Sequence, residues 1–260
     1  MTHTVRSLEF KNLPLIEAVV RVYFRDRIQV DFRLVNELHE PLRSDFPNVA
    51  PLSVLEVSPA LKHDTQLPIQ RGDLPGAEYS GGNQGLSVHL QPQLLAVRWR
   101  RGMSEHGPQY QNVRYLKLRN VLEGAFASLR KLRAAGELQT ALANMTYVNF
   151  IRIDDPRPYL KDEYSTRATI GAKAVQEQVV AWQTQNGIDL RFEIRGAELI
   201  GGIQKSVGYV LTTAAGRKLD TEVDPIPTLD AVHTELQVLF ANLISDRAKD
   251  EWGFQNGSVV

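Results

Sequence analysis

The segment from Leu15 to Phe24 constrains the fold most, because apolar side chains recur at every second position through it. One side of this alternation carries Ile16, Ala18, Val20, Val22 and Phe24, and the other carries Leu15, Glu17, Val19, Arg21 and Tyr23. A period of two with one fully apolar side predicts a β-strand that lies against the core. A carboxylate is costly to bury alone, so we expect Glu17 to pair with a nearby arginine.

Strand and helix patterns follow each other along the rest of the chain. Alternation predicts strands at 86–90, 94–100, 146–153, 190–195, 207–213 and 219–224. Apolar residues at helical spacing predict helices from Asp31 to about Pro47, from Asn112 to about Gly136, at 172–185, and from Thr228 to Trp252. Residues 49–84 contain many Pro, Gly and Asp, which predicts a loop or a peripheral hairpin.

This order of elements predicts an α+β fold, in which a mainly antiparallel sheet has long helices packed on one face. A chain of 260 residues can bury a substantial core, and we predict one domain over 1–260. The domain would consist of two topologically similar halves, 1–136 and 137–252, followed by a polar tail at 253–260. No exact sequence repeat relates these halves, so the predicted likeness is one of topology.

Composition excludes several classes of function. Lys and Arg total 30, as do Asp and Glu, so no net charge draws the chain to nucleic acid or anionic lipid. Cysteine is absent, which removes thiol nucleophiles, disulfides and thiolate metal sites. The sequence has no phosphate-binding glycine loop, no Gly-x-Ser-x-Gly turn, and no apolar run near the roughly 20 residues that span a bilayer. We expect a cytoplasmic protein without cofactor or membrane contact.

Three short patterns occur in a characteristic order. The first joins Asn12 and Pro14 to Ile16, Glu17, Ala18 and a strand that ends at Phe24; the second is Thr146–Ile151; the third joins Leu219–Asp224 to a helix with His233 and Phe240. In these patterns the chain resembles a sporadically distributed prokaryotic family of uncharacterised proteins of about this length. Thr146 departs from the arginine of that family's Arg-Tyr-Ile-Asn-like strand. The resemblance implies an α+β intracellular protein and no particular activity.

A group of carboxylates offers one route to catalysis. Asp220, Glu222 and Asp224 alternate in the predicted strand at 219–224, so they would leave the same face. Such a set can bind a divalent cation, and it would support a metal-dependent phosphoester hydrolase. No loop with metal-ligand spacing accompanies it, so we predict a solvated or arginine-paired strand face and no metal. We assign no catalytic residue.

The polar sides of the predicted strands carry more arginine than acid. Alternation places Glu17, Arg21, Arg98, Arg100, Arg191, Glu193 and Arg195 there. Guanidinium groups bind carboxylates and phosphates, which indicates a non-catalytic binding or accessory protein of a prokaryotic system, such as a defence system. Its partner would be another protein or a second copy of the chain. Zero net charge and few aromatic residues disfavour the alternative of nucleic-acid binding. An ordinary solvated face with weak ion pairs is the other alternative.

Overall fold

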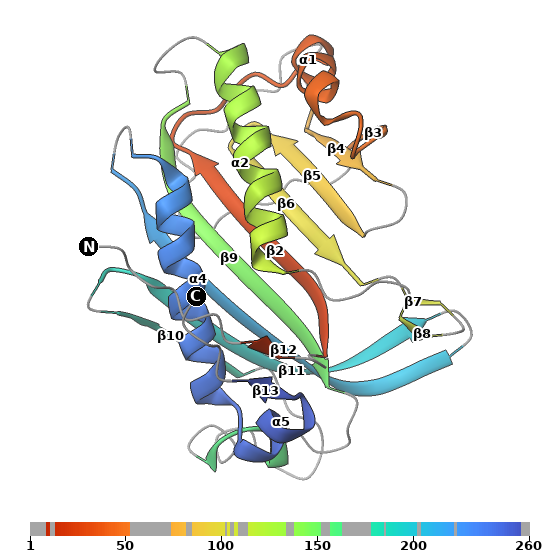
Figure 1. The fold of residues 1–260 in the computed structure, drawn as a ribbon, viewed down its shortest axis with the longest axis vertical. Helices are drawn as coiled ribbons and strands as arrows, with labels where there is room; N and C mark the ends of the chain where they lie inside the picture. Colours follow the sequence, from red (N-terminus) through yellow and green to blue (C-terminus); the bar gives the residue numbers. More distant parts are fainter. Residues whose placement is uncertain are drawn as a thin grey trace.

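The computed structural model describes residues 9–10, 14–52, 74–81, 85–101, 103–104, 107–108, 114–133, 138–151, 157–162, 178–184, 186–201, 204–220 and 223–255. Within them the protein has the predicted α+β fold (Figure 1). The main sheet has nine antiparallel strands in the order β10-β11-β12-β9-β2-β6-β5-β4-β3. Its mainly antiparallel character was also predicted.

The bounds of the elements are as follows. The main sheet contains β2 (Leu15–Phe24), β3 (Asn48–Pro51), β4 (Ala77–Ser80), β5 (Leu86–Gln91), β6 (Leu94–Arg100), β9 (Thr140–Ile151), β10 (Gln178–Gln183), β11 (Asp189–Gly201) and β12 (Gln204–Lys218). The helices are α1 (Phe32–Leu42), α2 (Tyr115–Leu132), α4 (Pro225–Leu243) and α5 (Asp246–Glu251), with a 3-10 turn η1 (Arg157–Tyr159). Two small ladders pair β1 (Glu9–Phe10) with β13 (Phe254–Gln255), and β7 (Met103–Ser104) with β8 (Gly107–Pro108).

Strand β2 lies at the centre of the sheet, between β6 and β9. Val20 is opposite Val97 on β6 and Met145 on β9, and all three side chains are fully buried. A strand with neighbours on both edges and a core against one face requires an apolar residue at every second position. The predicted strand at 15–24 is therefore confirmed.

A β-bulge changes the start of β2. The register with β9 shifts between Leu15 and Glu17, so the alternation of the strand is broken there. As a result Leu15 joins the main apolar core, whereas Ile16 is only partly buried and does not belong to it. The prediction of which strand face Leu15 and Ile16 occupy is therefore wrong. A bulge of one residue cannot be recognised from the hydrophobic pattern, because both residues are apolar.

The long helices contribute apolar stripes to the same core. Helix α2 contacts β2 and β6, α4 contacts β9 and β12, and α1 contacts α2 and β4. Leu122 and Leu129 of α2 and Leu229 and Leu236 of α4 are completely buried. In Figure 1 both helices cross in front of the sheet, and we call the side that they contact the helix-bearing face. None of the described helices is long and apolar enough to cross a membrane.

Side-chain caps fix where several helices begin. The Asp31 carboxylate accepts a hydrogen bond from the Leu34 backbone N–H at 2.8 Å, as predicted for the start of α1. The predicted cap of α2, Asn112, lies outside the described residues. The predicted helix to Trp252 is interrupted after α4, because Ser245 caps the separate short helix α5.

Two secondary-structure predictions are wrong within the described residues. Strand β12 ends at Lys218, and the chain at 219–220 and 223–224 is not a strand. The described part of the predicted helix at 172–185 forms the edge strand β10 instead. The segment 49–84 contributes β3 and β4, which pair antiparallel at the edge of the main sheet, so the peripheral-hairpin alternative is confirmed for the described residues; positions 53–73 and 82–84 lie outside them.

Candidate functional site

The sheet face opposite the main apolar core carries the predicted binding residues. We call this set the arginine face: Glu17 and Arg21 of β2, Arg98 and Arg100 of β6, and Arg191, Glu193 and Arg195 of β11. Phe192 and Ile194 are fully buried in the main core, so the residues that alternate with them leave the sheet on the other side.

Glu17 joins two of these arginines. Its Oε2 atom accepts hydrogen bonds from Arg98 Nη2 at 2.8 Å and from Arg100 Nε at 2.9 Å. The side chains of Glu17 and Arg98 are 19% and 20% exposed, whereas Arg100 is 62% exposed. The expected pairing of Glu17 with a nearby arginine is observed, and it offsets the cost of burying the carboxylate in the sheet.

Arg21 makes a separate set of contacts on the same face. Its Nη1 group donates to Thr146 Oγ1 at 2.9 Å and to Asn144 Oδ1 at 3.3 Å, both on β9. Asn144 in turn donates to the Ala215 carbonyl of β12 at 2.9 Å. Thr146 therefore receives a guanidinium group from the neighbouring strand.

The arginines of β11 form a second cluster. Arg191 Nη2 lies 3.0 Å from one carboxylate oxygen of Glu193, and Arg195 Nε lies 3.9 Å from the other. Strands β12 and β9 separate β11 from β2, which corresponds to roughly 14 Å between the two clusters. The structure therefore brings Arg98 and Arg100 together with Glu17 and does not bring all five predicted arginines together.

Apolar side chains interrupt the arginine face near its centre. Val19, Tyr23, Leu94, Ala96 and Leu142 form a small buried cluster that is separate from the main core. Each of them is at most 6% exposed, although they lie on the same side of the strands as Arg21 and Arg98. The face is therefore not uniformly polar, and its charged groups surround an apolar centre.

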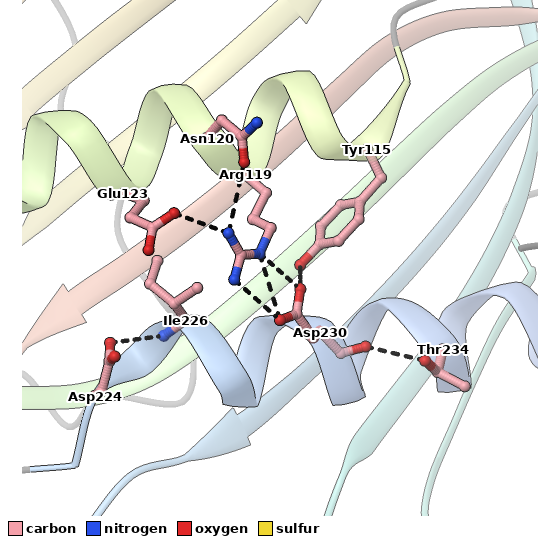
Figure 2. A network of polar contacts seen from close by, with 8 residues as sticks. All are labelled: Tyr115, Arg119, Asn120, Glu123, Asp224, Ile226, Asp230 and Thr234. Atoms are coloured by element: carbon pink, nitrogen blue, oxygen red, sulfur yellow. Dashed lines mark hydrogen bonds and ion pairs between the residues drawn. The ribbon is translucent and has the colours of Figure 1, made fainter. Parts of the chain in front are cut away.

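The three carboxylates considered as metal ligands do not share a strand. Asp220 follows the end of β12 and is exposed, and Glu222 lies outside the described residues. Asp224 accepts a hydrogen bond from the Ile226 backbone N–H at 3.1 Å, which makes it the N-cap of α4 (Figure 2). Among the described residues, no three His, Asp or Glu side chains are grouped to hold a metal ion.

A row of polar residues beside Arg98, formed by Ser87, His89 and Glu78, was not predicted from the sequence. Ser87 is opposite Arg98 in the β5–β6 pair, and His89 is opposite Glu78 in the β4–β5 pair. Ser87 Oγ lies 2.8 Å from His89 Nε2, and Glu78 Oε1 lies 3.6 Å from the same nitrogen. In a catalytic triad the acid and the nucleophile contact different ring nitrogens, so this arrangement is not one. The alternation of Ser87 and His89 with apolar residues in 86–90 was the available signal.

A second polar network joins α2 to α4 (Figure 2). The Asp230 carboxylate accepts hydrogen bonds from the Tyr115 hydroxyl at 2.7 Å and from Arg119 Nε at 3.0 Å. The hydrogen bond to Asp230 raises the pKa of Arg119, and burial together with Asp230 raises the pKa of Tyr115. Both groups therefore stay protonated, and the network acts as a fixed link between the helices. Its partners are more than 100 positions apart, so the sequence alone gave no signal.

His233 packs beside this network. Its ring stacks on Tyr115 with a centroid distance of 3.8 Å, and Tyr147 approaches it edge-on at 6.4 Å. Burial lowers the pKa of His233 to about 4, so the ring is neutral at pH 7. His233 Nδ1 and Asn149 Oδ1 are buried without a hydrogen-bond partner among the described residues. These two residues of the family-like patterns therefore lie on the helix-bearing face and not on the arginine face.

Neither a protein-family model nor a curated protein matches this chain. The resemblance to a prokaryotic family stays a prediction that rests on the three sequence patterns. What the fold and the site define is an α+β protein whose antiparallel sheet bears paired arginines on the side of the strands away from the main apolar core.

Proposed function

We propose that this chain is a non-catalytic binding protein of the prokaryotic cytoplasm, and that it recognises an acidic surface of a protein partner through its arginine face. The observation that carries the proposal is the cluster of Glu17, Arg98 and Arg100, in which one carboxylate holds two guanidinium groups. An arginine that is already held in place loses little freedom when it binds a second carboxylate. Arg191 and Arg195 supply a second contact point on the same side of the sheet.

The described polar groups give little support to an enzyme. A general acid or base works best when its pKa lies near the working pH, whereas the pKa of His233 is about 4 and that of Tyr115 is raised. Glu78 approaches the same nitrogen of His89 that Ser87 contacts. Asp224 is a helix cap, so among the described residues the hydrolase alternative lacks the pair of carboxylates that would hold its metal ion.

The test uses the purified full chain and a partner captured from lysate of the native host. Calorimetry would compare the wild type with Arg100→Gln and with the double variant Arg191→Gln/Arg195→Gln. We expect each change to weaken partner binding by about tenfold, because each removes contacts between opposite charges. Binding by the wild type should also weaken as salt rises from about 0.05 to 0.2 M.

Arg43→Gln provides the matched control, because Arg43 forms an exposed ion pair with Glu40 on α1 and lies outside the arginine face. This variant should bind the partner as the wild type does. Charge reversal at Arg98 is a poorer test, because a new carboxylate would face Glu17 in a partly buried site. Unchanged partner binding in both arginine variants, or capture of nucleic acid in place of a protein, would contradict the proposal.

We also infer that the fold consists of two topologically similar halves with their long helices on one face. The strand order supports this inference. From the central strand β2 toward one edge of the sheet the order is β6, β5, β4, and from the central strand β9 toward the other edge it is β12, β11, β10. The long helices hold equivalent places in the two series. In the chain α2 comes after β6, the neighbour of β2, and α4 comes after β12, the neighbour of β9. An experimental structure in which the two series fail to superpose would rule this out.

A further inference from the structure

A cavity of about 570 Å³ lies over β4, β5 and β6 on the face opposite the helices. This volume falls within the roughly 300–1,000 Å³ of sites that bind small molecules. The polar side chains that line it among the described residues are Glu78, Ser80, Ser87, His89, Gln91, Arg98 and Arg100. Leu52 and Leu86 contribute apolar side chains to its lining. A few charged groups that converge on a concave site are typical of a ligand-binding cavity.

Arg98 lines the cavity and is only partly used by contacts within the described residues. Its Nη2 group donates to Glu17, but its Nε–H is buried and has no hydrogen-bond partner within the described residues. Buried donors without partners are rare in native proteins, so this part of Arg98 is not satisfied by the contacts of the described residues. Arg100 lines the same cavity, and its Nε–H is the group that Glu17 engages. A guanidinium group has five N–H donors, so both arginines retain capacity for an anion.

The strands β4 and β5 supply groups of a different kind. The Glu78 side chain is 39% exposed and offers carboxylate oxygens to a ligand. Ser87 and His89 are buried, and they contact each other at 2.8 Å. Carboxylate and hydroxyl oxygens accept hydrogen bonds from the hydroxyl or amino groups of a ligand. The cavity therefore has a cationic side on β6 and a side rich in acceptors on β4 and β5.

We propose that this cavity binds a small anionic metabolite, with its phosphate or carboxylate group on Arg98 and Arg100 and its hydroxyl or amino groups toward Glu78 and Ser87. The inference goes beyond the proposed function, although it shares two arginines with the arginine face. Guanidinium groups form paired hydrogen bonds with both phosphate and carboxylate, so the two anions share one recognition chemistry. The choice between them is made by the probes.

Calorimetric titration of the full chain with glucose 6-phosphate, glutarate and inorganic phosphate tests the proposal, and glucose serves as the uncharged control. Saturable binding of glucose 6-phosphate or inorganic phosphate assigns the site to phosphate, and saturable binding of glutarate assigns it to carboxylate. We expect Arg100→Gln to weaken that binding by about tenfold. No saturable binding of any charged probe up to about 10 mM would overturn the inference, as would equal binding by Arg100→Gln and wild type.

Two further variants separate this site from the partner surface. Ser80→Leu would fill the cavity while it leaves both arginines in place, so it should abolish anion binding and preserve partner binding. Arg195→Gln lies on the arginine face outside the cavity, so it should preserve anion binding. The double variant Arg191→Gln/Arg195→Gln should weaken partner binding and leave anion binding unchanged. The two proposals can therefore fail independently of each other. Circular dichroism melting shows whether each variant is folded. If Ser80→Leu is unfolded, the anion titration of Arg100→Gln decides whether the cavity binds the anion.

Discussion

Glu17 accepts hydrogen bonds from two guanidinium groups in a partly buried part of the sheet. Glu17→Gln would keep the size of the side chain and remove its charge, so that Arg98 and Arg100 would face each other without a counter-ion. We expect the free energy of unfolding to fall by about 1.5 to 3 kcal/mol, as for the loss of hydrogen bonds to a charged group. Urea denaturation of the variant and the wild type measures this difference.

The exposed pair of Glu40 and Arg43 provides the comparison for Glu17. Exposed ion pairs contribute about 0 to 1 kcal/mol, so Glu40→Gln should change the unfolding free energy much less than Glu17→Gln does. Equal effects of the two substitutions would show that the contacts of Glu17 stabilise the fold no more than a surface pair does.

His233 makes the stability of the protein depend on pH. Burial lowers its pKa to about 4, whereas an unfolded histidine titrates near pH 6.5. Between these values the unfolded chain binds a proton that the folded chain does not, so this contribution to stability is lost as the pH falls from about 6.5 to about 4. The loss amounts to roughly 3 kcal/mol at 1.36 kcal/mol per pKa unit.

Unfolding curves of wild type and His233→Gln at pH 7, 5.5 and 4 check this expectation. The other titrating groups are common to both proteins, so the difference between their unfolding free energies should shrink by roughly 3 kcal/mol over this range. Parallel pH dependence of the two proteins would show that His233 titrates normally in the folded state.

Helix α4 begins at Asp224, a helix cap at a position for which alternation predicts a strand residue. Asp224 accepts from the Ile226 N–H, and Pro225 occupies the first turn of the helix. Asp224→Ala should lower the unfolding free energy by about 1 kcal/mol, as the loss of an N-cap does. Asp220→Ala, at an exposed position outside any strand or helix, should change it by less than about 0.5 kcal/mol in the same thermal or urea denaturation.

Elements with a strong local signal could be predicted, and contacts between distant elements could not. The alternation at 15–24 and the Asp31 cap each depend on neighbours within a few positions, and both predictions are confirmed. The choice of Arg98 and Arg100 as partners of Glu17 depends on which strands lie side by side, more than 80 positions apart in sequence. The arginines of the candidate site were identified from the same local alternation. Its cavity depends on the pairing of β4 with β5, and β4 lies in the segment predicted as a loop or a peripheral hairpin, whose partner strand the sequence does not indicate.

The whole molecule should unfold as one cooperative unit, because β2 and β9 join the two ends of the sheet through a continuous ladder. Met145→Ala would remove a fully buried side chain at this junction and should lower the unfolding free energy by about 2 to 5 kcal/mol. Far-UV dichroism and tryptophan fluorescence should report a single, coincident transition in both proteins. Two separate transitions in the variant would instead indicate that the halves are independent domains.

The position of that junction also sets the order in which the chain can fold. Neighbouring hairpins such as β5 with β6 close over a few residues, whereas Arg21 of β2 meets Thr146 of β9 across 125 positions. Contacts between distant positions form late, because a long loop must be closed before they stabilise anything. During synthesis one edge of β2 therefore stays without its neighbour until β9 has left the ribosome, and in that interval a largely apolar strand is open to pairing with other chains.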